Sequence, residues 1–136
     1  MLSSLLAIAL QAAAPPPTID CSAADRSACA TSIYFDSGEG TAIRSEWTTG
    51  LDEVAARLRS GGSVRIDSFT DRSGPEFANR RVAVQRARSV KAALLRRGVP
   101  TERITVVTHG EANPLVATAD GVREPQNRRV DLTIVP

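Results

Sequence analysis

The sequence predicts an α/β fold, an α+β sandwich in which helices cover a mixed, mostly parallel four-stranded sheet. Short β-prone runs alternate with amphipathic helical patterns in the order β-α-β-α-β-loop-β. The 136 residues suffice for one domain, and 42% apolar with 24% charged residues is typical of a globular core. Because strand–helix–strand units have right-handed crossovers, we expect the first three strands to run parallel in one sheet.

The first half of the chain contains two of the expected strands. Residues 32–35 (SIYF) predict a short strand that ends at the turn residues Asp36-Ser37-Gly38. Thr49 begins a T-x-x-D capping pattern, and apolar residues at helical spacing follow it as far as Gly61-Gly62. Residues 64–70 alternate apolar and polar side chains, which indicates the second strand.

The second half begins with a helix-start pattern. Residues 73–76 (SGPE) combine a capping box with a proline suited to a first helical turn. A long helix is expected from there to Arg97, with Gly98 as its C-terminal cap. Residues 104–108 and 130–135 predict the third and fourth strands, with a polar loop between them.

The N-terminus indicates export from the cytoplasm. Residues 1–14 hold a short apolar run followed by Ala12-Ala13-Ala14, which suits a cleaved signal peptide; an apolar N-terminus on a cytosolic protein is the alternative. Residues 15–31 form a separate segment with Cys21 and Cys29, which in an oxidising compartment would form a disulfide worth about 2–3 kcal/mol. The run is too short to span a membrane, so no transmembrane segment is expected in the mature chain.

Charge and composition argue against several classes of function. A net charge of +2 is too small for a general polyanion binder, although arginines gather between residues 72 and 97. Stacking aromatics are missing around them, so no nucleic-acid partner is expected. No third cysteine or neighbouring histidine suggests a metal, and no phosphate loop or other motif suggests a cofactor.

Two acids and one arginine suggest a binding groove. Asp36 and Asp71 end the first two strands, and the carboxyl ends of parallel strands share one edge of the sheet. Arg86 lies about 16 Å along the long helix from Pro75, but its side chain leans back toward that edge. A ligand with separate ammonium and carboxylate groups would suit Asp71 and Arg86. Alternatively, Asp71 bonds its own turn and the arginines face water.

Catalysis has little support in the sequence. His109 is the only histidine and is expected to form a hydrogen bond in a loop. No serine lies in a nucleophile elbow. Asp36 and Asp71 could in principle act as an acid/base pair on a glycan, but the arginines around Asp71 would keep it ionised. The protein is therefore expected not to be an enzyme.

Several motifs in order are similar to one known family. The run TDRSGPEFANRRVAVQRA resembles the pattern T-D-x-x-G-x-x-x-x-N-x-x-L-S-x-x-R-A of the OmpA-like C-terminal domain, the peptidoglycan-binding module of outer-membrane protein A and peptidoglycan-associated lipoproteins. IYFDSG, HGEANP and GVREPQNRRVDLTI match further family motifs. The resemblance covers residues 32–136, the expected domain. It departs from the pattern at Phe69, at Val82-Ala83 and at Thr108.

The resemblance implies a non-catalytic site for the diaminopimelate residue of the peptidoglycan stem peptide. Asp71 matches the acid that contacts the ammonium group, and Arg86 matches the arginine that takes the carboxylate. Asp36, Asn79 and Arg128 match positions that line the same groove. The chain is then expected in the periplasm or cell envelope, where it could associate with the outer membrane and have envelope proteins as further partners. The alternatives are an envelope protein–protein adaptor with a vestigial groove and, less favoured, a cell-wall hydrolase.

Overall fold

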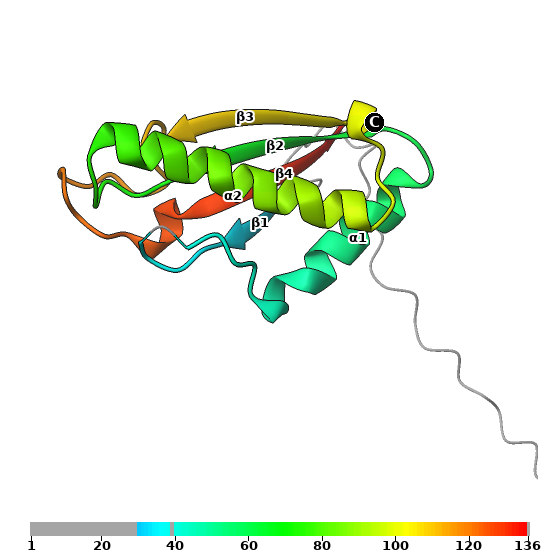
Figure 1. Ribbon diagram of the computed structural model, residues 1–136, viewed down its shortest axis with the longest axis horizontal. Helices are drawn as coiled ribbons and strands as arrows, with labels where there is room; N and C mark the ends of the chain where they lie inside the picture. The colour runs from blue at the N-terminus through cyan, green and yellow to red at the C-terminus, as the bar shows by residue number, and fades with distance from the viewer. Residues whose placement is uncertain (1–29, 39, 136) are drawn as a thin grey trace, which may run out of the picture.

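A computed structural model describes residues 30–38 and 40–135 (Figure 1). The predicted signal peptide and the predicted Cys21–Cys29 disulfide lie outside these residues. Along the chain, the elements are β1 (Ala30–Tyr34), α1 (Thr48–Leu58), β2 (Ser63–Phe69), α2 (Glu76–Arg96), β3 (Ile104–Gly110) and β4 (Arg129–Val135). Short 3-10 turns precede α1, β3 and β4 at Ser45–Trp47, Thr101–Arg103 and Pro125–Asn127.

The four strands form one mixed sheet in the order β1-β4-β2-β3. β4 is antiparallel to both β1 and β2, and β3 pairs in parallel with β2. The first three strands therefore share one direction, as expected, but β1 and β2 are not neighbours. The long loop before β4 lets the last strand enter between them, where its apolar residues Val130, Leu132 and Ile134 are buried.

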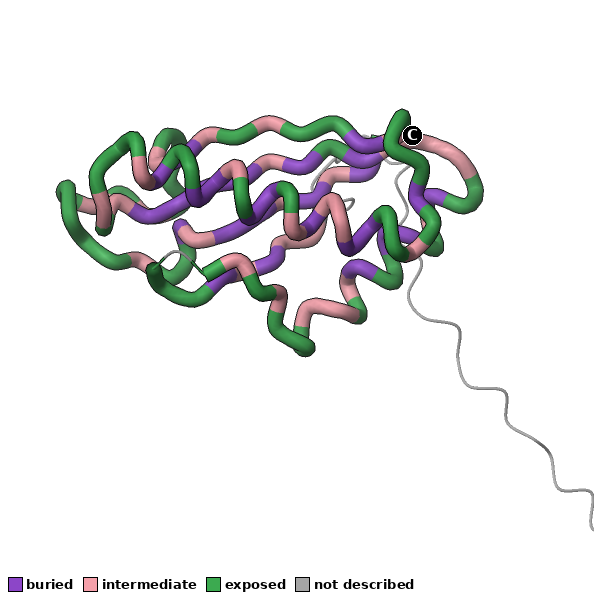
Figure 2. The backbone as a smooth tube through the Cα atoms, in the orientation of Figure 1, coloured by how far each residue is buried: buried purple, intermediate pink, exposed green. Residues whose placement is uncertain are grey.

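Both helices cover the same face of the sheet and enclose the core (Figures 1 and 2). Inward-facing strand residues such as Ile66 and Leu132 are fully buried, as are Val90 and Leu94 of α2. Each such side chain stabilises the fold by about 1.5–3 kcal/mol relative to an exposed one. The two-layer α/β arrangement places the carboxyl ends of β1 and β2 and the start of α2 at the same end of the molecule (Figure 1).

The helix-start predictions were wrong in detail. α1 begins at Thr48 as a continuation of the 3-10 turn, and its preceding residue, Trp47, forms no side-chain cap. Pro75 is the residue before α2, and no side chain caps that helix either. The hydroxyl of Ser73 donates to the Asp71 carboxylate over 2.6 Å, a hydrogen bond that the negative charge of the acceptor strengthens.

The predicted end of α2 is confirmed. The helix stops at Arg96, and Gly98 has a φ of 86°, a conformation that favours glycine. The Val99 amide donates to the Leu94 carbonyl over 3.1 Å, which satisfies a carbonyl of the last helical turn.

Candidate functional site

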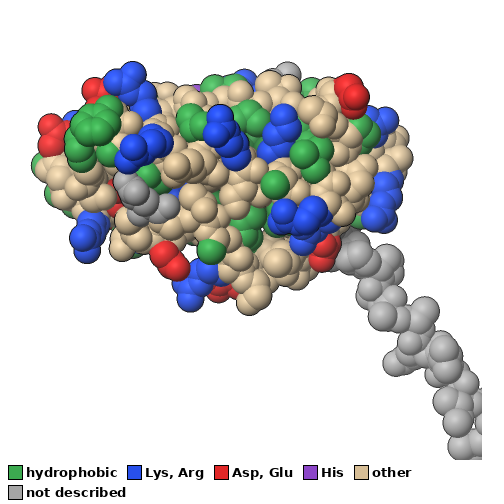
Figure 3. All heavy atoms as spheres, viewed as in Figure 1, with side chains coloured by type: hydrophobic (Ala, Val, Ile, Leu, Met, Phe, Trp, Pro, Cys, Tyr) green, Lys and Arg blue, Asp and Glu red, His purple; other side chains and the backbone are tan. Residues whose placement is uncertain are grey.

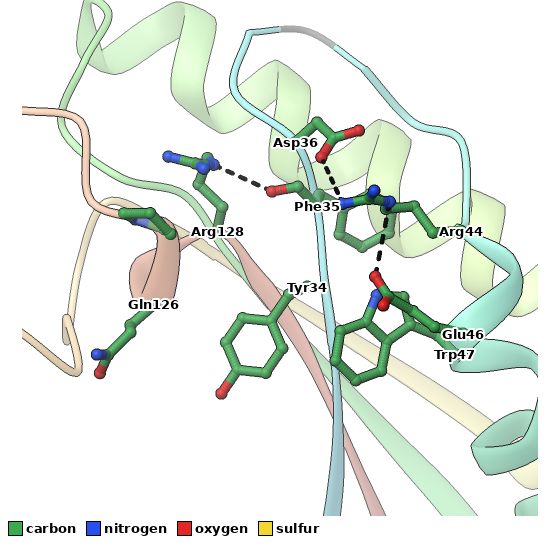
Figure 4. Close-up of a pocket in the computed structure, with 9 residues that line it drawn as sticks. Tyr34, Phe35, Asp36, Arg44, Glu46, Trp47, Gln126 and Arg128 are labelled. Carbon is green, nitrogen blue, oxygen red and sulfur yellow. Dashed lines mark hydrogen bonds and ion pairs between the residues drawn. The ribbon is translucent and has the colours of Figure 1, made fainter.

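The candidate site lies where the end of β1, the turn after β2 and the start of β4 meet. Arg128, directly before β4, joins the three segments. Its Nη1 lies 3.0 Å from Asp71 Oδ2, and its Nε donates over 3.0 Å to the carbonyl oxygen of Phe35, as Figure 4 shows for the second bond. The Phe35 amide in turn donates to the Arg128 carbonyl over 2.9 Å. The site is therefore held by a side-chain and backbone connection between strands that are remote in sequence.

Asp71 is buried, and its carboxylate accepts four hydrogen bonds. Oδ1 accepts from the amide and the hydroxyl of Ser73, and Oδ2 accepts from the Glu124 amide and from Arg128. Burial alone would raise the pKa of Asp71, but the bonds from Ser73, Arg128 and the backbone together lower the pKa below its ordinary value. The Asp71 carboxylate is thus negatively charged at neutral pH.

Arg86 is also buried, with only 1% of the residue exposed. Its Nη2 donates to the carbonyl oxygens of Asp36 and Gly38, each over 2.9 Å, and its Nε donates to that of Gly40 over 3.0 Å. The Phe35 ring lies 5.2 Å from the guanidinium carbon. Burial and the charge of Arg128 lower the pKa of Arg86 to about 10, so the side chain stays protonated at neutral pH.

The remaining two predicted residues point elsewhere. The Asp36 carboxylate is exposed and faces Arg44 at 3.4 Å (Figure 4), and the hydrogen bond from Arg86 goes to the backbone carbonyl of Asp36. The side-chain Nδ2 of Asn79 donates to the Gly74 carbonyl over 2.9 Å and to Glu111 Oε2 over 3.0 Å. The structure thus gathers Asp71, Arg86 and Arg128, while among the described contacts none joins Asn79 to them.

The sequence did not indicate the residues whose hydrogen bonds and ion pair hold the β3–β4 loop in place beside this site. Asn127 is fully buried and exchanges two hydrogen bonds with the backbone of Val116. Arg72 forms an ion pair with Asp120 and donates to the Thr118 carbonyl over 3.0 Å. Asn127 lies in the N-R-R motif beside Arg128, but its partner is backbone, so no residue pattern could reveal the pairing.

A pocket of about 390 Å³ opens beside Arg128 (Figure 4). Its walls combine aromatic, charged and amide side chains, and the lining residues are Tyr34, Phe35, Asp36, Arg44, Glu46, Trp47, Pro125, Gln126 and Arg128.

His109 and the arginines of α2 other than Arg86 are not among the residues that form the site. Figure 3 shows lysine and arginine side chains separated by other residue types on the face over α2, without one continuous cationic patch. His109 lies in β3 and not in a loop; its Nε2 is 2.8 Å from Asp67 Oδ1, and its ring stacks on Phe69.

The described residues hold neither a metal-binding cluster nor a helix that could span a membrane. Residues 30–38 and 40–135 contain no cluster of three or more His, Cys, Asp or Glu side chains that could hold a metal ion. Within the same part of the chain, no helix has the length and apolar character needed to cross a membrane.

Comparisons with known proteins match this fold and its motifs. The chain is 38% identical over 103 residues to an outer membrane protein of Gluconacetobacter diazotrophicus, covering 67% of this chain and 27% of the relative. It is 34% identical over 86 residues to the peptidoglycan-binding protein ArfA of Mycobacterium tuberculosis, covering 62% of this chain and 26% of that protein. The chain thus spans about a quarter of the length of these two relatives.

A solved structure and a family model agree with these relatives. The crystal structure of the peptidoglycan-associated lipoprotein from Burkholderia pseudomallei has a TM-score of 0.70 and 28% identity, covering 76% of this chain and 89% of that one. Residues 34–128, which include every predicted ligand-binding residue, match the model of the OmpA family. The chain belongs to the OmpA family.

Proposed function

We propose that this protein binds peptidoglycan non-covalently in the cell envelope, through the diaminopimelate residue of the stem peptide. Two relatives whose names state a peptidoglycan-binding or peptidoglycan-associated protein support the class of ligand. The observation that carries the proposal is Arg86. Its guanidinium is buried and charged, yet the hydrogen-bond acceptors described for it are backbone carbonyls. A buried cation ordinarily pairs with an anion, and a ligand carboxylate would supply one.

Binding at Arg86 requires the segment at residues 36–40 to move. The three carbonyl oxygens that surround Nε and Nη2 occupy the positions that a bidentate carboxylate would take. The ligand therefore competes with this segment, and the exchange replaces dipoles by a full negative charge. Residues 36, 37, 38 and 40 are all exposed, so few packing contacts oppose their displacement.

The ammonium group of the ligand would bind Asp71. A carboxylate has about four lone-pair positions, and four donors already fill those of Asp71. The ammonium group therefore replaces a neutral donor, and the Ser73 hydroxyl is the one that can rotate away. Arg128 remains paired and keeps the carboxylate ionised.

This geometry favours binding over hydrolysis. A general acid needs a raised pKa, whereas the pKa of Asp71 is lowered. The carboxylate of Asp36 is exposed and paired with Arg44, away from Asp71. The pure protein should therefore release no soluble muropeptides from cell walls.

The experiment is a pull-down of the purified protein with peptidoglycan sacculi. The variant Arg86→Lys removes the fork that binds a carboxylate but keeps the charge, and Asp71→Asn removes the partner of the ammonium group. Arg88→Lys is the matched control, because Arg88 lies on the exposed face of the same helix. We expect Arg86→Lys and Asp71→Asn to lose retention at least about tenfold, free diaminopimelate to displace the wild type, and Arg88→Lys to bind normally.

Equal retention of Arg86→Lys, Arg88→Lys and wild type would refute the site. Far-ultraviolet circular dichroism of each variant separates loss of binding from loss of fold. In an adaptor with a vestigial groove, Asp71 and Arg86 would also form their hydrogen bonds with other groups of the protein. Retention that free diaminopimelate does not reduce would support that alternative.

A further inference from the structure

The pocket beside Arg128 has features that binding of diaminopimelate does not use. Asp71 and Arg86 do not line this pocket, whose walls come from the end of β1, the turn before α1 and the turn before β4 (Figure 4). Tyr34 and Trp47 form part of its wall, with ring centroids 5.5 Å apart and planes tilted by 47°. Both rings are only partly buried, so each has a surface available to a ligand.

The charges at the pocket rim balance. Asp36 and Glu46 supply two acids, and Arg44 and Arg128 supply two cations; Arg44 contacts both acids, at 3.4 and 3.6 Å. An anionic or cationic ligand would therefore gain little net attraction, and four charged side chains would desolvate poorly around a lipid chain. The rim suits an uncharged ligand that offers many hydrogen-bond donors and acceptors.

A sugar ring combines these requirements. Its C–H faces pack against aromatic rings, and its hydroxyl and acetamido groups form hydrogen bonds with planar side chains such as Gln126, Glu46 and Arg44. Figure 4 shows Gln126 on the Tyr34 side of the pocket and Glu46 and Arg44 beside Trp47, so polar groups flank the two rings. A volume of about 390 Å³ lies within the usual size range of small-molecule sites and accommodates one hexosamine.

We infer that the pocket formed by Tyr34, Trp47 and Gln126 is a subsite for an uncharged N-acetylated amino sugar of the peptidoglycan glycan strand. This inference rests on the proposed wall binding, which it extends from the stem peptide to the glycan. Asp36 and Arg128 border both sites, so one wall fragment can contact the two together. The subsite adds affinity for intact wall over free peptide, because both contacts then belong to one ligand.

The test uses the chain's single tryptophan as the probe. The purified protein is titrated with N,N′-diacetylchitobiose, a peptide-free disaccharide of N-acetylglucosamine, while Trp47 fluorescence is recorded. A saturable change is expected, with cellobiose as the control that has no acetamido groups. Saturation-transfer NMR should show contact of the protein with the ring and acetyl protons of the disaccharide.

Two substitutions in the pocket test whether it binds the disaccharide. Gln126→Ala changes an exposed side chain outside the core, and Tyr34→Val removes the ring while keeping a β-branched residue in the strand. Each should weaken disaccharide binding by about three- to tenfold, the value of one aromatic or hydrogen-bonded contact. Arg88→Lys, on α2 and outside the pocket, should bind the disaccharide like wild type.

The proposals of a sugar subsite and of a diaminopimelate site can be refuted independently. Arg86→Lys should no longer bind the diaminopimelate peptide but should keep the fluorescence response to the disaccharide. A disaccharide response in the wild type would support the subsite even if binding of the stem peptide were refuted. Absence of any saturable fluorescence or NMR signal with the disaccharide would overturn the subsite, as would a full response in both Gln126→Ala and Tyr34→Val. An equal response to cellobiose would overturn the preference for an acetylated sugar.

Discussion

Arg128 and Asp71, 57 positions apart in the chain, form a buried ion pair with 3.0 Å between Nη1 and Oδ2. The two side chains are 11% and 4% exposed, so water screens their attraction poorly. The pair joins the start of β4 to the turn after β2, and the Glu124 amide adds the end of the β3–β4 loop to the same carboxylate. One carboxylate therefore organises the site that is proposed to bind ligand.

Removal of this charge should destabilise the whole domain. Asp71→Asn leaves Arg128 buried without its anion and should lower the free energy of unfolding by about 3 kcal/mol. Urea denaturation measures the change. The control is Asp52→Asn, because Asp52 pairs with Arg97 but is 67% exposed; its cost should stay below about 1 kcal/mol. Equal effects of the two substitutions would contradict the special role of the buried pair.

The same carboxylate should make stability depend on pH in the acid range. Since folding lowers the pKa of Asp71 below its ordinary value, the unfolded chain takes up the proton first as the pH falls. The stability that Asp71 contributes is complete above its unfolded pKa and is lost as the pH falls through its folded pKa. Urea midpoints from about pH 6 to about pH 2 should therefore converge for wild type and Asp71→Asn. A constant gap would show that the pKa of Asp71 is not lowered.

Opening of the 36–40 segment should limit binding to the wall. Gly38 has a φ of 86°, so Gly38→Ala strains the closed segment by about 1 kcal/mol without any new side-chain contact. Because the closed segment competes with the ligand for Arg86, the variant should bind the diaminopimelate peptide up to about fivefold more tightly. Calorimetric titration measures the affinity.

Gly98 offers a matched control for that substitution. It has the same φ of 86° and equally open surroundings, but it lies at the C-terminal end of α2. Gly98→Ala should lower stability without changing affinity. Unchanged or weaker binding by Gly38→Ala would show that ligand does not displace the segment.

The β3–β4 loop should depend on one buried amide. Asn127→Asp retains the acceptor for the Val116 amide but loses the donor to the Val116 carbonyl, 2.8 Å away, and places a new charge in the interior. We expect a loss of about 2 kcal/mol and faster proteolysis between residues 111 and 124. Limited trypsin digestion followed by mass spectrometry would locate the cuts, with Arg123 as an exposed cleavage position in that loop. Cleavage at an unchanged rate would contradict the anchoring role.

Local patterns were sufficient to predict both α-helices and all four strands of the described chain, but not its short 3-10 turns. Alternation in residues 64–70 matches β2, and the glycine after the long helix marks its end, because these signals depend on neighbours in sequence. The helix starts were predicted less well. A capping box would have the Ser73 oxygen accept from a helix amide, whereas its hydroxyl donates to the Asp71 carboxylate, and only the folded turn shows this bond.

For the site, the sequence determined which charges exist and that Asp71 and Arg86 belong to the same end of the sheet. It also determined, through the order of the motifs, the family to which the chain belongs. The tertiary structure decided the partners: Arg128 for Asp71, loop carbonyls for Arg86, and a glutamate and a backbone carbonyl for Asn79. It also decided that β4 separates β1 from β2. Backbone carbonyls and strand order carry no residue signature, since every amino acid has the same backbone acceptor, so these contacts exist only once remote segments have packed together.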